Sequence, residues 1–308
     1  MERKIILVTR KTRLEELIVR FNTQAQARFY LVHSGADFND YQREHEQYKR
    51  VAKRAEAGLS SVGKVQVVDR TFLPNFIFGP DDIVVVLGQD GLVANTVKYL
   101  DGHPVIGVNP DPVRWDGVLL PFLADELETV VRDTMMAKRN YREVSLAEVR
   151  LNDGQTLLAV NDFFIGPRTH SSLRYTIRAG GPAEQQSSSG VIVSTGLGST
   201  GWLKSLVAGA RGIIGALSGG EFDMDDPTGL DWGADMLYFT VREPFPSQTS
   251  SANLVFGTVR GEQKLIIESM TPENGVIFSD GLQDDFLSFN SGTTAEIGIA
   301  AKKGMIVV

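Results

Sequence analysis

The sequence predicts two domains, a doubly wound α/β domain followed by an antiparallel β-sandwich, and three observations lead to this prediction. The chain has 308 residues, more than most single domains contain. Its first 140 residues alternate short apolar runs with helical patterns, which is typical of a parallel sheet covered by helices. From residue 141 onward, short strand-like runs separated by turn residues dominate. We therefore expect an α/β nucleotide-binding domain over 1–140 and a β-sandwich over 141–308.

The first domain shows the βα alternation directly. Strands are expected at Ile5–Val8, Ala27–Val32, Val65–Val68, Ile83–Leu87 and Val105–Val108, and helices at Lys11–Asn22, Asp37–Ala57 and Leu92–Leu100. The run Ile83–Leu87 is entirely apolar, which favours a central parallel strand buried on both faces. The segment Asp37–Ala57 is highly charged and is expected to be an exposed helix whose polar side faces water.

The second domain is predicted from short runs bounded by turns such as Asn152-Asp153-Gly154. The expected strands are Glu148–Leu151, Leu157–Val160, Leu173–Arg178, Gly190–Thr195, Met236–Val241, Ala252–Phe256, Lys264–Glu268, Gly275–Ser279 and Thr294–Ala300. One helix is expected, over Trp202–Leu217. The last segment, Gly304–Val308, is either a final strand of this domain or a return to the first one.

Composition excludes several classes of function. The chain contains no cysteine, which rules out disulfides, thiolate metal sites and cysteine nucleophiles. Its net charge of −7 argues against a general nucleic-acid-binding protein, which usually carries a basic surface. No apolar stretch approaches the roughly 20 residues of a membrane helix, so no membrane association is expected and the predicted localisation is cytoplasmic. The four histidines show no zinc-ligand spacing, so no protein-held metal site is expected.

The first candidate site is the turn Gly88-Gln89-Asp90-Gly91, which follows the apolar run 83–87. Open α/β sheets bind ligands at the carboxyl ends of their strands. Gly88 and Gly91 would let a phosphate approach the backbone, and the following helix offers free N–H groups to an anion. Asp90 is a candidate general base for an acceptor hydroxyl. Alternatively, Gly-x-Asp-Gly is a common tight turn without chemistry.

The second candidate is a glycine- and hydroxyl-rich loop between a strand and a helix, Thr195-Gly196-Leu197-Gly198-Ser199-Thr200-Gly201-Trp202. Its backbone N–H groups and hydroxyls could form an anion site, although it lacks the lysine of a Walker loop. Trp202 could stack on a base, or it could instead pack into the core. Two weaker candidates are Asn161-Asp162, inside an apolar strand, and Asp280-Gly281, after another; alone, each is more typical of a turn.

Taken in order, these motifs resemble the NAD kinase family. Gly88-Gln89-Asp90-Gly91 corresponds to the family's Gly-Gly-Asp-Gly turn, Asn161-Asp162 to its Asn-Glu pair, Gly198–Trp202 to its Gly-Ser-Thr-Ala-Tyr loop, and Asp280-Gly281 to a late Asp-Gly. The segment 106–112 with Gly117, the run 161–167 and Trp202 resemble the mitochondrial-type branch. The resemblance spans about residues 80 to 281, and four motifs in the same order are far more specific than one.

The resemblance implies an active site between the two domains and transfer of a phosphoryl group from ATP, with Mg²⁺, to the 2′-hydroxyl of the adenosine ribose of NAD, which gives NADP. Asp90 would be the catalytic base. Thr200 and Trp202 would hold the adenine, Asn161 and Asp162 would contact NAD, and Ser205 with the 196–199 loop would line the same pocket. The full set of expected substrate-binding residues is Gly88, Gln89, Gly91, Asn109, Asn161, Asp162, Thr195, Gly196, Gly198, Ser199, Thr200, Trp202, Ser205 and Asp280. The family also implies a homodimer or larger homo-oligomer.

Four departures from the family pattern leave the substrate open. Gln89 replaces a glycine, Leu92 stands in place of a threonine, Asp162 is one methylene shorter than glutamate, and Ser189 replaces an aspartate. Two alternatives therefore stand beside the NAD kinase hypothesis. One is a kinase of the same superfamily that phosphorylates a sugar or lipid. The other is a non-catalytic nucleotide sensor, which the changes at Gln89 and Leu92 favour.

Overall fold

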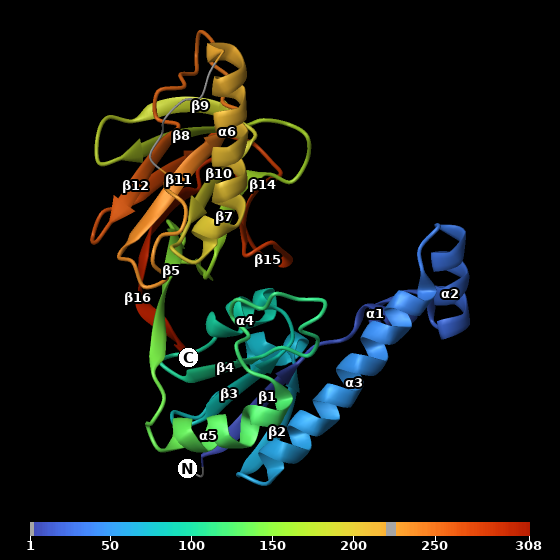
Figure 1. The fold of residues 1–308 in the computed structure, drawn as a ribbon. Helices are drawn as coiled ribbons and strands as arrows, with labels where there is room; N and C mark the ends of the chain where they lie inside the picture. The colour runs from blue at the N-terminus through green and yellow to red at the C-terminus, as the bar shows by residue number, and fades with distance from the viewer. Residues whose placement is uncertain (1–2, 220–225) are drawn as a thin grey trace. The chain divides into compact units, whose positions relative to one another are not determined.

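The structure is a computed structural model that describes residues 3–219 and 226–308 (Figure 1). The chain forms two compact units. Unit 1 comprises residues 1–142 together with 305–308, and unit 2 comprises residues 143–304. The chain therefore returns to unit 1 at its end, because strand β16 (Thr294–Val307) begins in unit 2 and its final residues belong to unit 1.

Unit 1 is built on a parallel sheet with the order β2-β1-β3-β4-β16. Its strands are β1 (Lys4–Thr9), β2 (Lys64–Asp69), β3 (Ile83–Leu87) and β4 (Pro104–Val108), and Met305 and Ile306 of β16 pair in parallel with Pro104 and Val105. Every residue of β3 is buried, as expected of a central strand with both faces covered.

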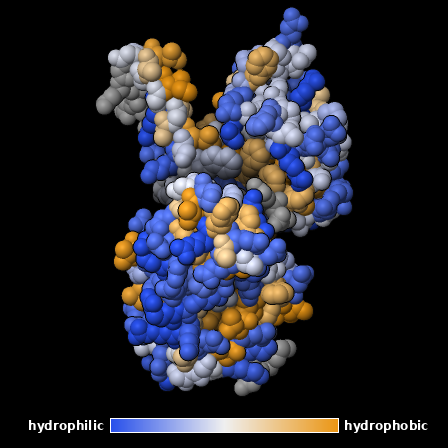
Figure 2. Space-filling model, turned by 90° about the vertical axis from the view of Figure 1, so that its right-hand side faces the viewer, coloured by the Kyte–Doolittle hydropathy of each residue, from blue (hydrophilic) through white to orange (hydrophobic). Residues whose placement is uncertain are grey.

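The helices of unit 1 are α1 (Arg13–Phe21), α2 (Gln24–His33), α3 (Phe38–Ser60), α4 (Asp90–Val97) and α5 (Leu127–Met135), with 3₁₀ turns η1 (Arg70–Asn75) and η2 (Ala124–Glu126). Figure 1 shows α3 and α5 beside each other. Their apolar side chains form one core with alternate residues of the sheet. The helical face of this unit is mainly hydrophilic in Figure 2, which agrees with the charged outer side of α3.

One expectation for unit 1 is wrong, and another is confirmed only in part. The segment Ala27–Val32 is not a strand but part of α2. Its apolar residues include Ala27 and Leu31, four positions apart, and both are buried on one side of the helix, while Thr23 caps the helix by accepting a hydrogen bond from Gln26 N. The helix α3 is not simply exposed, because a stripe that includes Glu44 and Tyr48 is buried.

Unit 2 is a sandwich of two sheets. One contains β5 (Tyr141–Leu151), β6 (Thr156–Ala159), β8 (Leu173–Ala179), β9 (Glu184–Ser188), β13 (Leu265–Ser269) and β16. The other has the order β12-β11-β10-β7-β14-β15 and antiparallel pairs, with β7 (Asp162–Pro167), β10 (Gly190–Ser194), β11 (Met236–Arg242), β12 (Phe256–Arg260), β14 (Gly275–Ser279) and β15 (Leu282–Ser288). Their inner faces share one core.

The second sheet of unit 2 also carries the turn η3 (Gly198–Thr200) and the helix α6 (Trp202–Ser218), which contacts β10. The expected strand Ala252–Phe256 is wrong except for its last residue, where β12 begins. The backbone N–H groups of Asn253 and Leu254 instead donate to the carboxylate of Glu184, so a side chain takes the donors that a strand would use.

Candidate functional site

The Gly88–Gly91 turn lies at the carboxyl end of β3, where open parallel sheets bind ligands. Gly88 is buried, and a Cβ atom there would lie only 2.7 Å from Cδ2 of Leu92. Gln89 is the N-cap of α4 but makes no capping hydrogen bond with its side chain. Gly91 is exposed. The turn therefore leaves N-terminal N–H groups of α4 and the Gln89 amide available to an anion.

The carboxylate of Asp90 is held by the loop that follows β4. Its Oδ1 accepts a hydrogen bond from Leu119 N at 2.6 Å, and the residue is half-buried. Within residues 3–219 and 226–308, this carboxylate forms no other hydrogen bond, so Oδ2 is available to a substrate. A carboxylate fixed on one side and open on the other has the geometry of a general base.

Asn109 braces the loop after β4 and is 5% exposed. Its Nδ2 donates to the carbonyl of Trp115 at 3.0 Å, and its Oδ1 accepts from Asp111 N at 3.0 Å. Gly117 has a φ of +67°, and a Cβ atom there would lie 2.6 Å from Asn109 Nδ2. The amide of Asn109 is thus engaged within its own loop, which favours a positioning role over direct contact with substrate.

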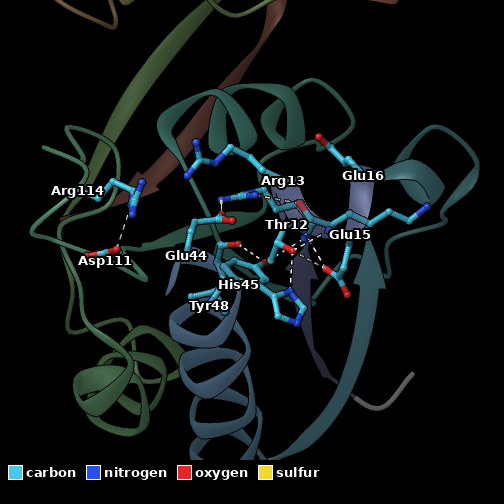
Figure 3. A network of polar contacts seen from close by, with 12 residues as sticks. Thr12, Arg13, Glu15, Glu16, Glu44, His45, Tyr48, Asp111 and Arg114 are labelled. Carbon is cyan, nitrogen blue, oxygen red and sulfur yellow. Dashed lines mark hydrogen bonds and ion pairs between the residues drawn. The ribbon is translucent and has the colours of Figure 1, made fainter. Parts of the chain in front are cut away.

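A polar network on the same edge of unit 1 was not expected from the sequence (Figure 3). The hydroxyl of Tyr48 donates to the carbonyl of Leu87 at 2.9 Å and accepts from Arg10 N at 3.0 Å. Burial raises the pKa of Tyr48 to about 12. Arg10 pairs with Glu44 at 2.8 Å, and both side chains are under 10% exposed. Helix α3 therefore fixes the end of β3 immediately before the Gly88 turn.

The same network extends to the loop after β4. Arg114 and Arg13 both donate to Asp40 of α3, at 2.7 Å and 2.8 Å, and their hydrogen bonds hold the pKa of that carboxyl well below its usual range. Figure 3 also shows His45 beside Thr12, whose hydroxyl lies 2.8 Å from His45 Nδ1. These contacts tie α1, α3 and the 109–117 loop together around the carboxyl edge of the sheet.

In unit 2, Asp280 organises the turn that contains Asn161. Asp280 has a φ of +52°, and its Oδ1 accepts hydrogen bonds from the backbone N–H groups of Val160 at 3.0 Å and Asn161 at 2.6 Å. Its own N–H donates to the carbonyl of Asp162 at 2.9 Å. The motifs Asn161-Asp162 and Asp280-Gly281, which are far apart in the sequence, therefore form one structure, in which Asp280 positions Asn161 and Asp162.

The hydroxyls of the 195–201 loop mostly serve the loop itself. Thr195 Oγ1 donates to the carbonyl of Val160 and accepts from Gly198 N, and Ser199 Oγ donates to the carbonyl of Gly196 at 2.7 Å. Thr195 and Ser199 have no exposed surface. A Cβ atom at Gly196 or Gly198 would overlap a neighbouring backbone carbonyl. This loop is a tightly packed support for the turn at Asn161 rather than an open anion site.

A pocket of about 580 Å³ lies beside this support. Its walls are mainly aromatic, and among the described residues two side chains with ionisable groups line it. The pocket residues used below are Phe164, Trp202, Phe278, Phe286, Asp162 and Arg168. Phe164 stacks on Trp202 with ring centroids 5.7 Å apart and an interplanar angle of 24°. A pocket with flat aromatic walls and few polar groups suits a planar ring such as a nucleobase.

Phe164 can lie flat because two glycines make room for its ring. A Cβ atom at Gly166 would overlap Phe164 Cζ, and one at Gly190 would lie 2.7 Å from Phe164 Cε2. In the antiparallel register, Phe164 is opposite Phe278, and Phe278 is opposite Phe286. The three phenylalanines thus form a row across adjacent strands, which is a favourable cross-strand arrangement.

Asp162 brings a carboxyl group into this aromatic surrounding. It is 8% exposed. Burial, with a smaller contribution from the negative charge of Asp280, raises the pKa of Asp162 to about 7. The carboxyl group can therefore act as either a donor or an acceptor of hydrogen bonds near neutral pH, which is a common feature of functional sites.

The remaining expected residues lie at the edge of this region. Trp202 begins α6 and is half-buried, whereas Thr200 and Ser205 are exposed and their hydroxyls donate to backbone carbonyls at 3.3 Å and 3.4 Å. Asn161 is half-buried. Sequence reasoning missed Phe164, Phe278, Phe286 and Arg168. A signal was present, because positions 162, 164, 166 and 168 alternate along one strand and so share a face.

Within the described residues, no group of three or more histidine or acidic side chains could hold a metal ion. No helix in the described part of the chain is long and apolar enough to cross a membrane.

Comparison with known proteins establishes the fold. No family model and no curated protein sequence matches the chain. Among solved structures, a yeast NADH kinase in complex with NADH has a TM-score of 0.56 at 15% identity, covering 99% of this chain and 83% of that one. An NAD kinase from Archaeoglobus fulgidus in complex with ATP has a TM-score of 0.54 at 15% identity, covering 100% and 94%. The predicted fold, an α/β domain followed by a β-sandwich, is therefore confirmed and is shared with NAD(H) kinases.

Proposed function

We propose that this protein is an NAD kinase, which transfers a phosphoryl group from Mg-ATP to the 2′-hydroxyl of the adenosine ribose of NAD. The observation that carries the proposal is the aromatic pocket of unit 2, in which Trp202 and Phe164 stack beside the buried carboxyl group of Asp162. Flat rings bind a base by stacking, and a carboxyl group in the same pocket recognises its amino group or a ribose hydroxyl. The fold shared with kinases in complex with NADH and with ATP supports this assignment.

In this proposal the motif residues of unit 2 have two kinds of role. Trp202, Asn161 and Asp162 contact the acceptor, with Thr200 and Ser205 at the edge of the pocket. Thr195, Ser199 and Asp280 act as positioning residues, because their side chains are engaged with neighbouring groups of the protein. Gly196 and Gly198 allow the close backbone approach that brings this support together.

Unit 1 would supply the phosphoryl donor side. Gly88, Gln89 and Gly91 bind phosphate oxygens of ATP at the N-terminus of α4, where anions are favoured. Asp90 accepts the proton of the 2′-hydroxyl as that oxygen attacks the γ-phosphorus, while the bond from the γ-phosphorus to the bridging oxygen breaks and ADP leaves. Mg²⁺ is part of the Mg-ATP substrate and neutralises charge on the phosphates. The homo-oligomeric state and the cytoplasmic localisation expected from the family resemblance belong to the same proposal; sedimentation velocity tests the former.

The test is the formation of NADP by purified protein incubated with Mg-ATP and NAD. NADH, a panel of sugars and diacylglycerol vesicles are offered in parallel, with ADP release as the common readout. We expect ADP release to depend on NAD or NADH and NADP(H) to form in equal amount. ADP release stimulated by a sugar or by diacylglycerol, with no NADP(H), would contradict the proposal.

One observation favours a second candidate, a nucleotide sensor without turnover. Leu92 is buried, and its side chain lies against Gly88, where the family has a hydroxyl. Together with Gln89, this change makes the donor side less polar and more crowded. Calorimetric binding of NAD or ATP without any ADP release, in the presence of Mg²⁺ or Mn²⁺, would support the sensor over the kinase.

A further inference from the structure

The aromatic pocket of unit 2 has a carboxyl group at one end of strand β7 and a guanidinium group at the other. Residues 162, 164, 166 and 168 alternate along β7 and the position that follows it, so they face the same side of the sheet. Asp162 lies at the beginning of this row and Arg168 at its end, with Phe164 and Gly166 between them. Six residue steps of about 3.3 Å place their Cα atoms roughly 20 Å apart along the strand. Both side chains nevertheless line the same pocket.

Arg168 is held in place by its surroundings without being neutralised by them. Its guanidinium carbon lies 4.2 Å from the ring centroid of Phe286, a close cation–π contact. Its backbone N–H donates to the carbonyl of Asn274 at 2.8 Å, which fixes the chain as it leaves β7. Within the described part of the chain, no carboxylate forms an ion pair with Arg168. A guanidinium stacked on a ring keeps its N–H edge directed outward, where it can form two parallel hydrogen bonds to an oxyanion.

A second arginine near these rings, Arg242, differs from Arg168 because it forms an ion pair. Arg242 lies over both Trp202 and Phe164, at 5.5 Å and 6.0 Å from their centroids, but it also pairs with Glu243 at 3.5 Å. Its charge is therefore partly compensated, and it supports the back of the aromatic wall. Among the described residues that line the pocket, Arg168 is the cation.

We propose that Arg168 forms an anion subsite at one end of the aromatic pocket and binds a phosphate group of the acceptor, so that the pocket selects nucleotides over nucleosides and sugars. This inference rests on the proposed function and extends it by naming the residue that recognises the phosphate of the acceptor. The base stacks against the aromatic wall formed by Trp202 and the row of phenylalanines. Its polar edge points toward Asp162, and its phosphate end points toward Arg168. The pocket would then accept a ligand in one orientation only.

The same chemistry could recognise either the single phosphate of a mononucleotide or the pyrophosphate of a dinucleotide. A ligand series separates them. Isothermal calorimetry at pH 7.5 and low salt measures the binding of adenosine, AMP and NAD to the wild-type protein, to Arg168→Ala and to Arg168→Lys. The matched control is Arg178→Ala, which removes an equal charge from an exposed position on β8, in the other sheet of unit 2.

We expect AMP and NAD to bind the wild-type protein about 10-fold more tightly than adenosine, because a charge-assisted hydrogen bond is worth about a factor of ten. Arg168→Ala should remove this advantage and leave the affinity for adenosine unchanged, Arg168→Lys should restore part of it, and Arg178→Ala should behave like the wild type. If NAD binds more tightly than adenosine but AMP does not, the subsite binds a pyrophosphate specifically. Equal affinities for all three ligands, an equal loss for adenosine in Arg168→Ala, or no binding of any of them would overturn the proposal.

The subsite and the proposed function can fail separately. If AMP and NAD lose affinity in Arg168→Ala while the wild-type protein forms no NADP from NAD and Mg-ATP, the subsite stands and the kinase assignment falls. If NADP forms but Arg168→Ala leaves the KM for NAD unchanged, the kinase assignment stands and the subsite falls.

Discussion

The two candidate regions of this molecule use their glycine-rich motifs in different ways. In unit 1, the Gly88–Gly91 turn presents its own groups: the Gln89 amide, one oxygen of Asp90 and the first N–H groups of α4. In unit 2, the side chains of the motif residues Thr195, Ser199 and Asp280 turn inward and bond to backbone groups of neighbouring residues. The surface that could bind a ligand there is formed by aromatic side chains on neighbouring strands.

The difference shows that a motif can mark a site without supplying its contacts. Chemistry at a phosphate requires a few polar groups at fixed points, which one turn can carry. Recognition of a planar ring requires area, which several strands must supply together. We therefore expect substitutions in the turn to act on the rate of reaction and substitutions around the pocket to act on binding or stability, and four variants test this division.

The largest effect is expected for Asp90→Asn. Loss of the general base should lower kcat on the order of 10²- to 10⁴-fold. The KM for NAD should change little, because the Asn oxygen can still accept the hydrogen bond from Leu119 N. Steady-state kinetics with Mg-ATP and NAD measure both values, with the exposed Asp101→Asn as the matched control. A variant with wild-type kcat would remove Asp90 from the mechanism.

The second effect concerns Asp162 and pH. The folded-state pKa of Asp162, about 7, lies above the unfolded value of about 3.9. Between these two pH values, Asp162 is protonated in the folded protein but ionised in the unfolded chain. The resulting stabilisation is complete below pH 4 and is lost as pH rises through 7. The free energy of unfolding should fall by about 3 kcal/mol between pH 5 and pH 8 from this group.

Asp162→Asn should remove this pH dependence. The free energy of unfolding of the variant, minus that of the wild type, should therefore be larger at pH 8 than at pH 5. Urea unfolding of unit 2 at several pH values, followed by circular dichroism, measures the difference, and Asp101→Asn again serves as the control. Parallel pH profiles for the wild type and Asp162→Asn would contradict the assigned pKa.

A smaller effect, confined to binding, is expected for Trp202→Ala. Loss of one stacking partner should weaken NAD binding by roughly 10- to 100-fold, since stacking of a base on an aromatic ring is worth about 1–3 kcal/mol. Trp202→Phe should recover most of the affinity. Calorimetry measures the Kd, and Trp115→Phe, in unit 1, is the control for removal of a tryptophan. Unchanged affinity in Trp202→Ala would mean that the base binds elsewhere.

The smallest effect is expected for Gly166→Ala. The added Cβ overlaps the far end of the Phe164 ring, so the ring should tilt away from Trp202 while the strand remains folded. We expect NAD affinity to fall by roughly 2- to 10-fold, the range of an aromatic pair. In a protein that already carries Phe164→Leu, adding Gly166→Ala should not lower NAD affinity further, because the ring that the Cβ displaces is absent. As a control, Gly181→Ala, with open space around its Cβ, should leave NAD affinity unchanged.

The sequence predicted more of the fold than of the site. Apolar runs such as Ile83–Leu87 identified the central strands, because burial on both faces permits little else. The segment Ala27–Val32 failed because a short apolar run fits a strand or a helix equally well, and only contact with Leu14 and Phe38 decides between them. The alternation along β7 was visible in the sequence, but its place in an aromatic row was not, because Phe164 and the opposite residue Phe278 on β14 are 114 residues apart in the sequence.

The most direct test of the account is a crystal structure of the protein grown or soaked with NAD. We expect the adenine ring to lie in the pocket of unit 2, stacked on Trp202, with its polar edge at Asp162 and a phosphate within hydrogen-bonding distance of Arg168. NAD bound elsewhere on the protein while this pocket stays free of it, or a nicotinamide ring in place of the adenine on Trp202, would contradict that prediction.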